Sequence, residues 1–355
     1  MKHLLLLLIP FCLFLIGCND DDALLDPAYQ PVGESAFTDC VNAESWQLDD
    51  VNFQINEMIQ FGDYFVFGGF SNLLIMDEDL ETVVVDEEVE GRKLLPIGDK
   101  LIICGQDGLY EFASNTETFS TLDASVFCQD IIIGPDGELL IANGSSLTQS
   151  VLEYNFVQGG LRPYSDVPLV DEICTGVFDL ALSENDKVWV STCRDLILKF
   201  DSRTFEAAFN TEDEPLLQGR SDDLFLLPYQ DGVVVVAKNG TGFYQILKYT
   251  GGEWIELIHF SLLNSVTTSK EVFMTRPSIM EAFIKDDLLY VATVLAGCEG
   301  IQRFDISKNE ELTEDDYDAF EDPFYNNQCI NGMTLEGDGD VYILVNGNQL
   351  VRVDC

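Results

Sequence analysis

The stretch VFDLALSENDKVWVST, residues 177–192, reads as two short strands joined by a tight turn. Both halves are rich in the apolar and β-branched residues that favour strands. Between them lies Asn185-Asp186, and these two residue types tolerate the positive φ angles that a tight hairpin requires. The stretch LILKFDSRT, residues 196–204, adds a third strand. Together these residues predict one small antiparallel sheet.

The same pattern recurs along the chain. Its second strand is the clearest element, and it begins at Tyr64, Leu101, Leu139, Val188, Val233, Leu288 and Val341. Successive starts are 37, 38, 49, 45, 55 and 53 residues apart, a spacing typical of propellers and other repeat arrays. A pair containing Gly, Asp or Asn precedes each start, as in Gly62-Asp63 and Asp136-Gly137. No long stretch has the 3.6-residue apolar period of a helix.

Seven such units, each with four short strands, predict an all-β, seven-bladed β-propeller. The seventh unit has one further strand after Val341, at Leu350–Cys355, and is therefore one strand short. The segment from Cys40 to Leu48 precedes the first unit and belongs to no blade of its own. We expect it to supply the missing strand, which would close the ring and cover an open sheet edge. The alternatives are six or eight blades, or a pair of β-sandwiches.

Two propeller families share this blade pattern. The stretches 177–192 and 196–204 resemble the blades of two-component-regulator sensor propellers. More weakly, DIIIGPDGELLIAN at 130–143 and NGMTLEGDGDVY at 331–342 are similar to blades of gluconolactonase-like propellers. The resemblance covers about half of the chain and carries over fold better than function.

The N-terminus predicts export and lipidation. Lys2 is followed by an apolar run from Leu4 to Ile16, which is too short to span a bilayer as a helix. Leu15-Ile16-Gly17-Cys18 resembles the lipobox of bacterial lipoproteins, in which the Cys becomes the acylated first residue. We therefore expect a signal peptide at 1–17, a lipidated tether at 18–39 and the propeller at 40–355. The alternative is an ordinary secretory signal with an accidental Cys.

The distribution of charge indicates where the protein is located and which classes of partner it can bind. Asn19-Asp20-Asp21-Asp22 resembles the surface-export signal of some Gram-negative lipoproteins, which predicts an outer-membrane protein exposed at the cell surface. The whole chain has 63 acidic and 18 basic residues, a net charge of −45. This excess excludes nucleic acid as a partner, because phosphate binding needs a basic patch. The apolar content of 46% indicates a folded acidic domain.

Eight cysteines remain after Cys12 and Cys18 are set aside, and an even number in an exported chain indicates disulfides. In a propeller, the end of a second strand lies on the same face as the start of its own and the next blade's first strand. This geometry predicts the pairs Cys174–Cys193, Cys104–Cys128 and Cys298–Cys329. By elimination, Cys40 pairs with Cys355 across the ring closure.

Few residues indicate catalysis. His259 is the one His after the signal peptide, so a multi-His metal site within one chain is excluded. In gluconolactonase-like enzymes, Glu, Asn and Asp side chains hold a divalent cation in the channel; Asn143 and Asn331 lie in phrases similar to that family's. Several first strands also begin with an acid that would face the channel: Glu57, Asp130, Asp179, Asp223 and Glu281. Such oxygen ligands would take Ca²⁺, although a hydrated channel in an acidic chain is the simpler interpretation.

The sequence thus favours a non-catalytic surface lipoprotein. Its propeller would bind a protein or glycan partner, either alone or as an accessory subunit of an outer-membrane complex. The alternative is a lactonase- or esterase-like hydrolase that depends on a divalent cation at the central channel. Three or four convergent carboxylate or amide oxygens around one point would favour the enzyme.

Overall fold

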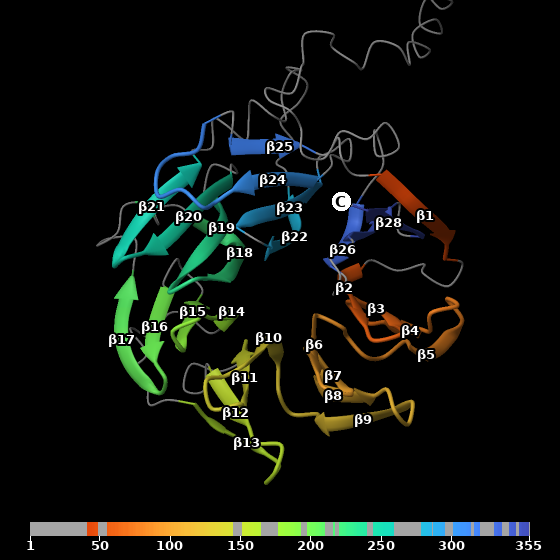
Figure 1. Cartoon of the computed structure of the whole chain (residues 1–355). Helices are drawn as coiled ribbons and strands as arrows, with labels where there is room; N and C mark the ends of the chain where they lie inside the picture. The colour runs from red at the N-terminus through yellow and green to blue at the C-terminus, as the bar shows by residue number, and fades with distance from the viewer. Residues whose placement is uncertain are drawn as a thin grey trace, which may run out of the picture.

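The computed structural model contains seven antiparallel sheets of four strands each, arranged in a ring (Figure 1). It describes residues 41–48, 55–144, 151–164, 177–192, 197–209, 216, 220–239, 244–258, 278–285, 287–294, 301–313, 316–319, 330–335, 341–345 and 348–354. The predicted seven-bladed propeller is confirmed, and the alternatives of six or eight blades and of two sandwiches are wrong. The described residues form no α-helix, and none of them makes a helix that could cross a membrane.

The first strand of every blade lies innermost, and the first strands contact one another around the ring. In order from blade one to blade seven they are β2 (Ile55–Phe61), β6 (Lys93–Ile97), β10 (Cys128–Ile133), β14 (Val177–Leu182), β18 (Arg220–Tyr229), β22 (Ser278–Lys285) and β26 (Ile330–Leu335). The second strands are β3 (Tyr64–Gly69), β7 (Lys100–Gly105), β11 (Leu139–Asn143), β15 (Lys187–Thr192), β19 (Gly232–Asn239), β23 (Leu288–Val294) and β27 (Val341–Val345). All seven second strands lie where the repeat predicts them.

The outer half of each blade consists of its third and fourth strands. The third strands are β4 (Leu73–Met76), β8 (Gly108–Ala113), β12 (Val151–Tyr154), β16 (Ile197–Asp201), β20 (Tyr244–Thr250), β24 (Ile301–Asp305) and β28 (Gln349–Asp354). The fourth strands are β5 (Thr82–Asp86), β9 (Thr118–Asp123), β13 (Leu161–Pro163), β17 (Thr204–Phe209), β21 (Glu253–Ile258), β25 (Tyr317–Ala319) and, for blade seven, β1 (Val41–Gln47).

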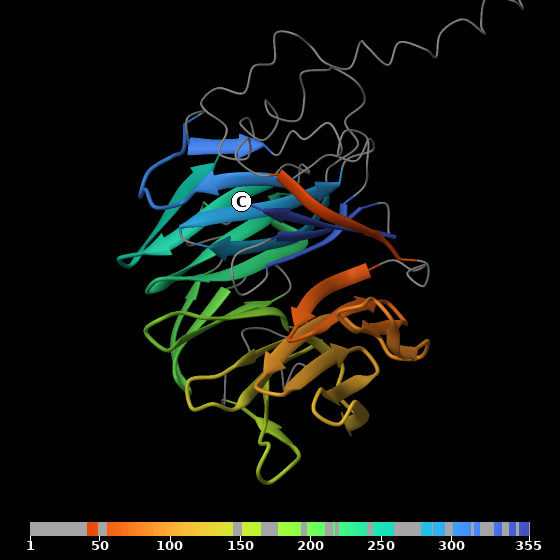
Figure 2. The ribbon, with the colours of Figure 1, turned by 45° about the vertical axis from the view of Figure 1, so that its right-hand side comes forward.

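The N-terminal strand closes the ring, as predicted. Strand β1 pairs with β28 in antiparallel register from Val41 opposite Asp354 to Gln47 opposite Gln349. In Figure 2 the red strand β1 lies beside the dark blue C-terminal strands. Pairing the two ends of the chain in one blade converts an open array into a closed ring, which removes two exposed sheet edges.

The hairpins between first and second strands fix the register of each blade. Gly62, Gly98, Gly137 and Asp186 adopt φ angles of 58°, 63°, 78° and 61°, as the turn residues predict. We call the face that carries these turns the hairpin face. The third strand of a blade ends, and its fourth strand begins, on this same face. Because β28 is a third strand and β1 a fourth, the chain enters the propeller at Val41 on the hairpin face.

The core lies between the blades. Alternate residues of each second strand face opposite neighbours: in β7, Leu101 and Ile103 pack in the cluster shared with blade one, whereas Ile102 and Cys104 pack in the cluster shared with blade three. This is why the second strands read as continuous apolar runs with both faces buried. The blade four–five cluster is aromatic, with Trp189 in edge contact with Tyr249 at 4.9 Å between ring centres.

Candidate functional site

One position on the first strands recurs in all seven blades, and we call it the rim position. To define it, we take one five-residue segment of each second strand: 65–69, 101–105, 139–143, 188–192, 233–237, 289–293 and 341–345. The rim position is the first-strand residue that pairs with the fourth residue of this segment, as Glu57 pairs with Gly68. By this register the rim positions are Glu57, Lys93, Asp130, Asp179, Phe225, Glu281 and Gly332. A bulge immediately precedes the rim position in blades one, three, four, six and seven.

The structure describes three acidic rim side chains, and each of them links its own blade to the following blade. Asp130 Oδ2 accepts a hydrogen bond from the backbone N–H of Leu180, at 2.7 Å. Asp179 Oδ2 accepts one from the N–H of Leu226, at 2.6 Å. Glu57 accepts the equivalent bond from the N–H of Leu94. Each donor is the residue that follows the rim position in the next blade.

The geometry of a propeller explains this arrangement. A first strand pairs with its second strand on one side only, so alternate N–H groups on its other edge have no strand partner. A buried N–H that lacks a partner is costly, and a carboxylate is a strong acceptor. Each of the three rim carboxylates therefore satisfies one orphan donor across a boundary between blades, which we call a seam.

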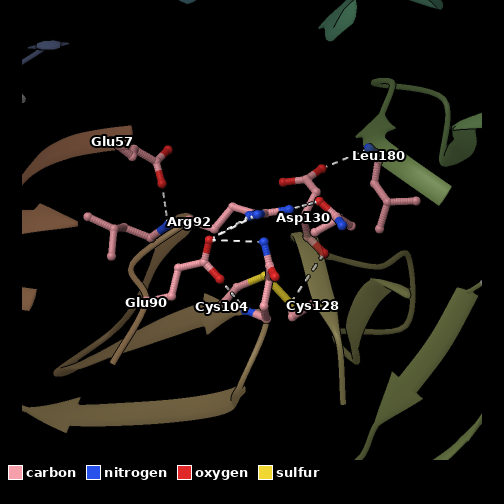
Figure 3. The surroundings of a disulfide bond; sticks show 10 residues. Glu57, Glu90, Arg92, Cys104, Cys128, Asp130 and Leu180 are labelled. Carbon is pink, nitrogen blue, oxygen red and sulfur yellow. Dashed lines mark hydrogen bonds and ion pairs between the residues drawn. A yellow bond between two sulfur atoms is a disulfide. The ribbon is translucent and has the colours of Figure 1, made fainter. Parts of the chain in front are cut away.

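The seam between blades two and three is fastened differently, because its rim residue is Lys93. Lys93 turns back to Glu57, with 2.7 Å between Nζ and Oε1. The disulfide Cys104–Cys128 joins β7 to β10 across this seam, as predicted, and both cysteines are fully buried. Arg92 also crosses the seam, donating from Nη1 to the amide oxygen of Gln129 (Figure 3).

A buried carboxylate holds Arg92 in place. Glu90 is only 4% exposed, and its Oε1 accepts hydrogen bonds from Nε and Nη2 of Arg92 at 3.2 and 2.9 Å. Its other oxygen accepts from the backbone N–H of Gln106 at 2.6 Å. The guanidinium lies 5.9 Å from the ring centre of Phe127. Figure 3 shows Glu90 and Arg92 beside the disulfide. This cluster adds a layer of charged hydrogen bonds beside the disulfide.

The seam between blades five and six, where the rim residue is Phe225, is fastened by a buried lysine. Lys248 in β20 is 1% exposed, and its Nζ donates to the carbonyls of Ile306 and Lys308 at 2.7 and 3.1 Å. It also lies 4.6 Å from the ring centre of Tyr229. Burial lowers the pKa of Lys248, and the carboxylates of Asp287 and Asp305 oppose the shift.

Electrostatics single out the rim acids. Burial raises the pKa of Glu57, and the neighbouring Lys93 ammonium opposes that shift. Burial raises the pKa of Asp179 well above its ordinary value of 3.8, and the contacting Asp130 carboxyl adds to the increase. Asp130 is itself 4% exposed. The inner rim of blades one to four is thus a connected set of three acids and one lysine.

The remaining candidate residues occupy several places. Asn143 is 5% exposed at the end of β11, opposite Cys128. Asp223, Glu281 and Asn331 belong to β18, β22 and β26, but their side chains lie outside the described part of the structure. Asp223 falls in the irregular pairing between Arg220 and Leu224, two residues before the rim position. Within the described residues, no group of three or more His, Cys, Asp or Glu side chains is arranged to hold a metal ion.

The other predicted cysteines cannot be placed in the same way. Cys18, Cys40, Cys174, Cys193, Cys298, Cys329 and Cys355 all lie outside the described residues. Their pairing, and the lipidation of Cys18, stay predictions. The pairing of Val41 with Asp354 does bring the immediate neighbours of Cys40 and Cys355 into register.

The sequence pattern alone does not single out Lys93, Arg92, Glu90 or Lys248. Lys93 could have been found by aligning the second strands and counting back across each hairpin, because it occupies the position of Glu57 in the next blade. Lys248 carries no such signal, since an isolated lysine in a strand usually faces solvent.

Comparisons with known proteins establish the fold. No protein family matches the sequence, and no curated protein is similar to it at a significant level. Virginiamycin B lyase from Staphylococcus aureus superposes with a TM-score of 0.60 at 11% identity, over 88% of this chain and 98% of that one. The extracellular domain of a putative hybrid two-component system from B. thetaiotaomicron gives 0.59 at 12% identity, over 87% of this chain and 42% of that one. The WD40 propeller domain of Doa1 gives 0.56 at 10% identity, over 89% and 97%. The chain therefore shares the β-propeller fold with a lyase, the extracellular domain of a two-component system and a WD40 domain.

Proposed function

We propose that this chain is a lipoprotein of the outer membrane, anchored through Cys18 and exposed at the cell surface. Its propeller is a non-catalytic binding module for a protein or glycan partner, alone or as an accessory subunit of an outer-membrane complex. The extracellular two-component-system domain of similar fold is consistent with a surface location.

The role of the rim carboxylates carries this proposal. A hydrolase of the kind considered above would use channel oxygens to hold a divalent cation. Here each described rim acid already accepts a backbone N–H from the next blade, and Glu57 also pairs with Lys93. These contacts commit the carboxylates to holding the ring together, which favours a rigid binding scaffold over a cation centre.

The two faces of the propeller differ in a way that suggests where a partner binds. The predicted tether would join at Val41 on the hairpin face, and we therefore place the partner on the opposite face. On that opposite face, the turn between β3 and β4 presents Phe70, which is 55% exposed. Its turn is held by a close approach of Gly68 to Gly91, where a Cβ on Gly68 would lie 2.3 Å from the Gly91 carbonyl oxygen.

The anchor is tested in cells. Wild type and Cys18→Ser are expressed with a radiolabelled fatty acid, and intact cells are treated with protease. We expect label and protease sensitivity in the wild type, and an unlabelled, uncleaved or soluble product for Cys18→Ser. A mutant that is still processed and membrane-bound would contradict lipidation. A labelled wild type that resists protease on intact cells would contradict surface exposure.

The binding role is tested by cross-linking the lipidated protein on intact cells and measuring what it retains. We expect one stoichiometric protein or glycan, with retention at least tenfold lower in Phe70→Ala, because exposed aromatic residues dominate interface energies. Val157→Ala is the matched control, since Val157 is 94% exposed at the end of blade three that lies on the hairpin face. Calcium-dependent turnover of lactones without a retained partner would support the hydrolase instead.

A further inference from the structure

The carboxyl groups of Asp130 and Asp179 meet at a single backbone N–H. Leu180 N lies 2.7 Å from Asp130 Oδ2 and 3.0 Å from Asp179 Oδ1, so these two oxygens are at most 5.7 Å apart. Asp179 uses its other oxygen to accept from Leu226. One N–H thus lies between two acids that come from adjacent blades.

From this geometry we propose that Asp130 and Asp179 share one proton, and that this proton determines how firmly blades three, four and five are held together. With one group protonated, the pair forms a carboxyl–carboxylate hydrogen bond and both backbone N–H groups keep their acceptors. With both groups ionised, two buried like charges face each other, which weakens the native structure.

The surrounding charges favour this state. Lys93 on β6 faces the pair and is already engaged with Glu57 on β2. Arg92, the residue before Lys93, is engaged with Glu90 and Gln129. The first strands β18 and β22 carry both acidic residues, Asp223 and Glu281, and basic residues, Arg220 and Lys285. Among the described side chains, Lys93 is shared with Glu57, which limits how far it can stabilise double ionisation of the pair.

The sign of the pH dependence follows. Asp179 has its pKa raised above 3.8 in the folded chain, so the folded chain binds more protons than the unfolded chain above that pH. Stability from this group is complete below pH 3.8 and is lost as the pH rises through the folded pKa. Glu57 shifts in the same direction. Glu153, Glu206 and Asp316 have lowered pKa values, so their effects fall below pH 4.5, outside the range of pH 5 to 8 used in the test.

The test is urea denaturation of the full propeller between pH 5 and 8. The wild-type midpoint should fall as the pH rises. Asp179→Asn keeps an oxygen that can accept from Leu226 and an N–H that can donate to Asp130. Between pH 5 and 8, its urea midpoint should therefore change by less than half as much as the wild-type midpoint. At pH 8 the midpoint of the variant should be higher than that of the wild type. Asp201→Asn, which removes an acid whose side chain is 62% exposed, is the charge-matched control and should keep the wild-type slope. An Asp179→Asn slope equal to that of the wild type would overturn the proposal.

A second readout covers the case in which Asp179→Asn does not fold. The carboxyl carbons of aspartate are labelled with ¹³C in the wild type and titrated by NMR. One signal should titrate well above the ordinary aspartate range, and Asp130→Asn should move it toward that range while leaving it raised by burial. A wild-type spectrum in which every described aspartate titrates near pH 4 would overturn the proposal.

Discussion

Two neighbouring seams of this ring are fastened by different chemistry. Between blades two and three, the rim residue is Lys93, and a disulfide, Cys104–Cys128, makes the link. Between blades three and four, the rim residue is Asp130, and a carboxylate bound to the N–H of Leu180 makes it. At the same level of the ring, one seam of this propeller is therefore held by a covalent bond and its neighbour by a hydrogen bond to a carboxylate.

The seam between blades seven and one extends this comparison and has the largest expected effect. Its rim residue is Gly332, which has no side chain to act as a latch. We predict that Cys40–Cys355 closes the ring elsewhere, within blade seven, between its outer strands β1 and β28. Peptide mapping without reduction should find this bridge, and removing both cysteines should lower the free energy of unfolding by about 5 kcal/mol, because the bridge closes most of the chain. Free thiols at both positions would refute the bridge.

The internal disulfide should contribute less. Cys104 and Cys128 are 24 residues apart, so replacing both by Ala should cost about 3 kcal/mol by loop-closure entropy. Chemical denaturation of the double variant measures the loss. A cost equal to that of the Cys40/Cys355 pair would show that native packing, rather than loop length, determines what these bridges contribute.

The hydrogen bond from Leu180 to Asp130 should contribute less to the free energy of unfolding than either disulfide. Asp130→Ala leaves the Leu180 N–H without its acceptor from blade three, and we expect a loss of about 1–3 kcal/mol in the free energy of unfolding. Asp123→Ala is a suitable control, because its carboxylate only accepts from Ser125 within an exposed turn. If the two variants lose the same free energy of unfolding, the hydrogen bond from Leu180 to Asp130 contributes no more to stability than a hydrogen bond in an exposed turn.

The lysine latch between blades five and six should have the smallest effect. Lys248→Met removes an ammonium whose burial is itself unfavourable, so the loss of its two bonds to carbonyls is partly offset. We expect a change of about 1 kcal/mol or less in the free energy of unfolding, measured by denaturation at pH 7. A loss several times larger would show that Lys248 contributes as much to the free energy of unfolding as a disulfide does.

The sequence predicts the fold well because its signals are local. Hairpin residues such as Gly62 and Asp186 mark the turns, and β-rich second strands such as Leu139–Asn143 mark the blades. The closure by β1 and the disulfide Cys104–Cys128 then follow from the blade geometry alone. These features need no knowledge of how side chains meet.

The role of the candidate site is harder to predict from the sequence, because it depends on contacts between side chains and backbone of different blades. The sequence shows that Asp130 and Asp179 begin first strands, and channel geometry alone suggests cation ligands. Only the structure shows that each carboxylate reaches an orphan N–H in the next blade. The irregular pairing between Arg220 and Leu224 likewise shifts the register, so that Phe225, rather than Asp223, takes the rim position.

Amide hydrogen exchange tests most directly whether the rim carboxylates fasten the blades. The Leu180 and Leu226 amides of the wild type should exchange slowly, because each donates to a carboxylate of the preceding blade. In Asp130→Ala the Leu180 amide should exchange at least tenfold faster, while the Leu94 amide, bound to Glu57, keeps its wild-type rate. Unchanged protection of Leu180, or equal acceleration of both amides, would contradict the account.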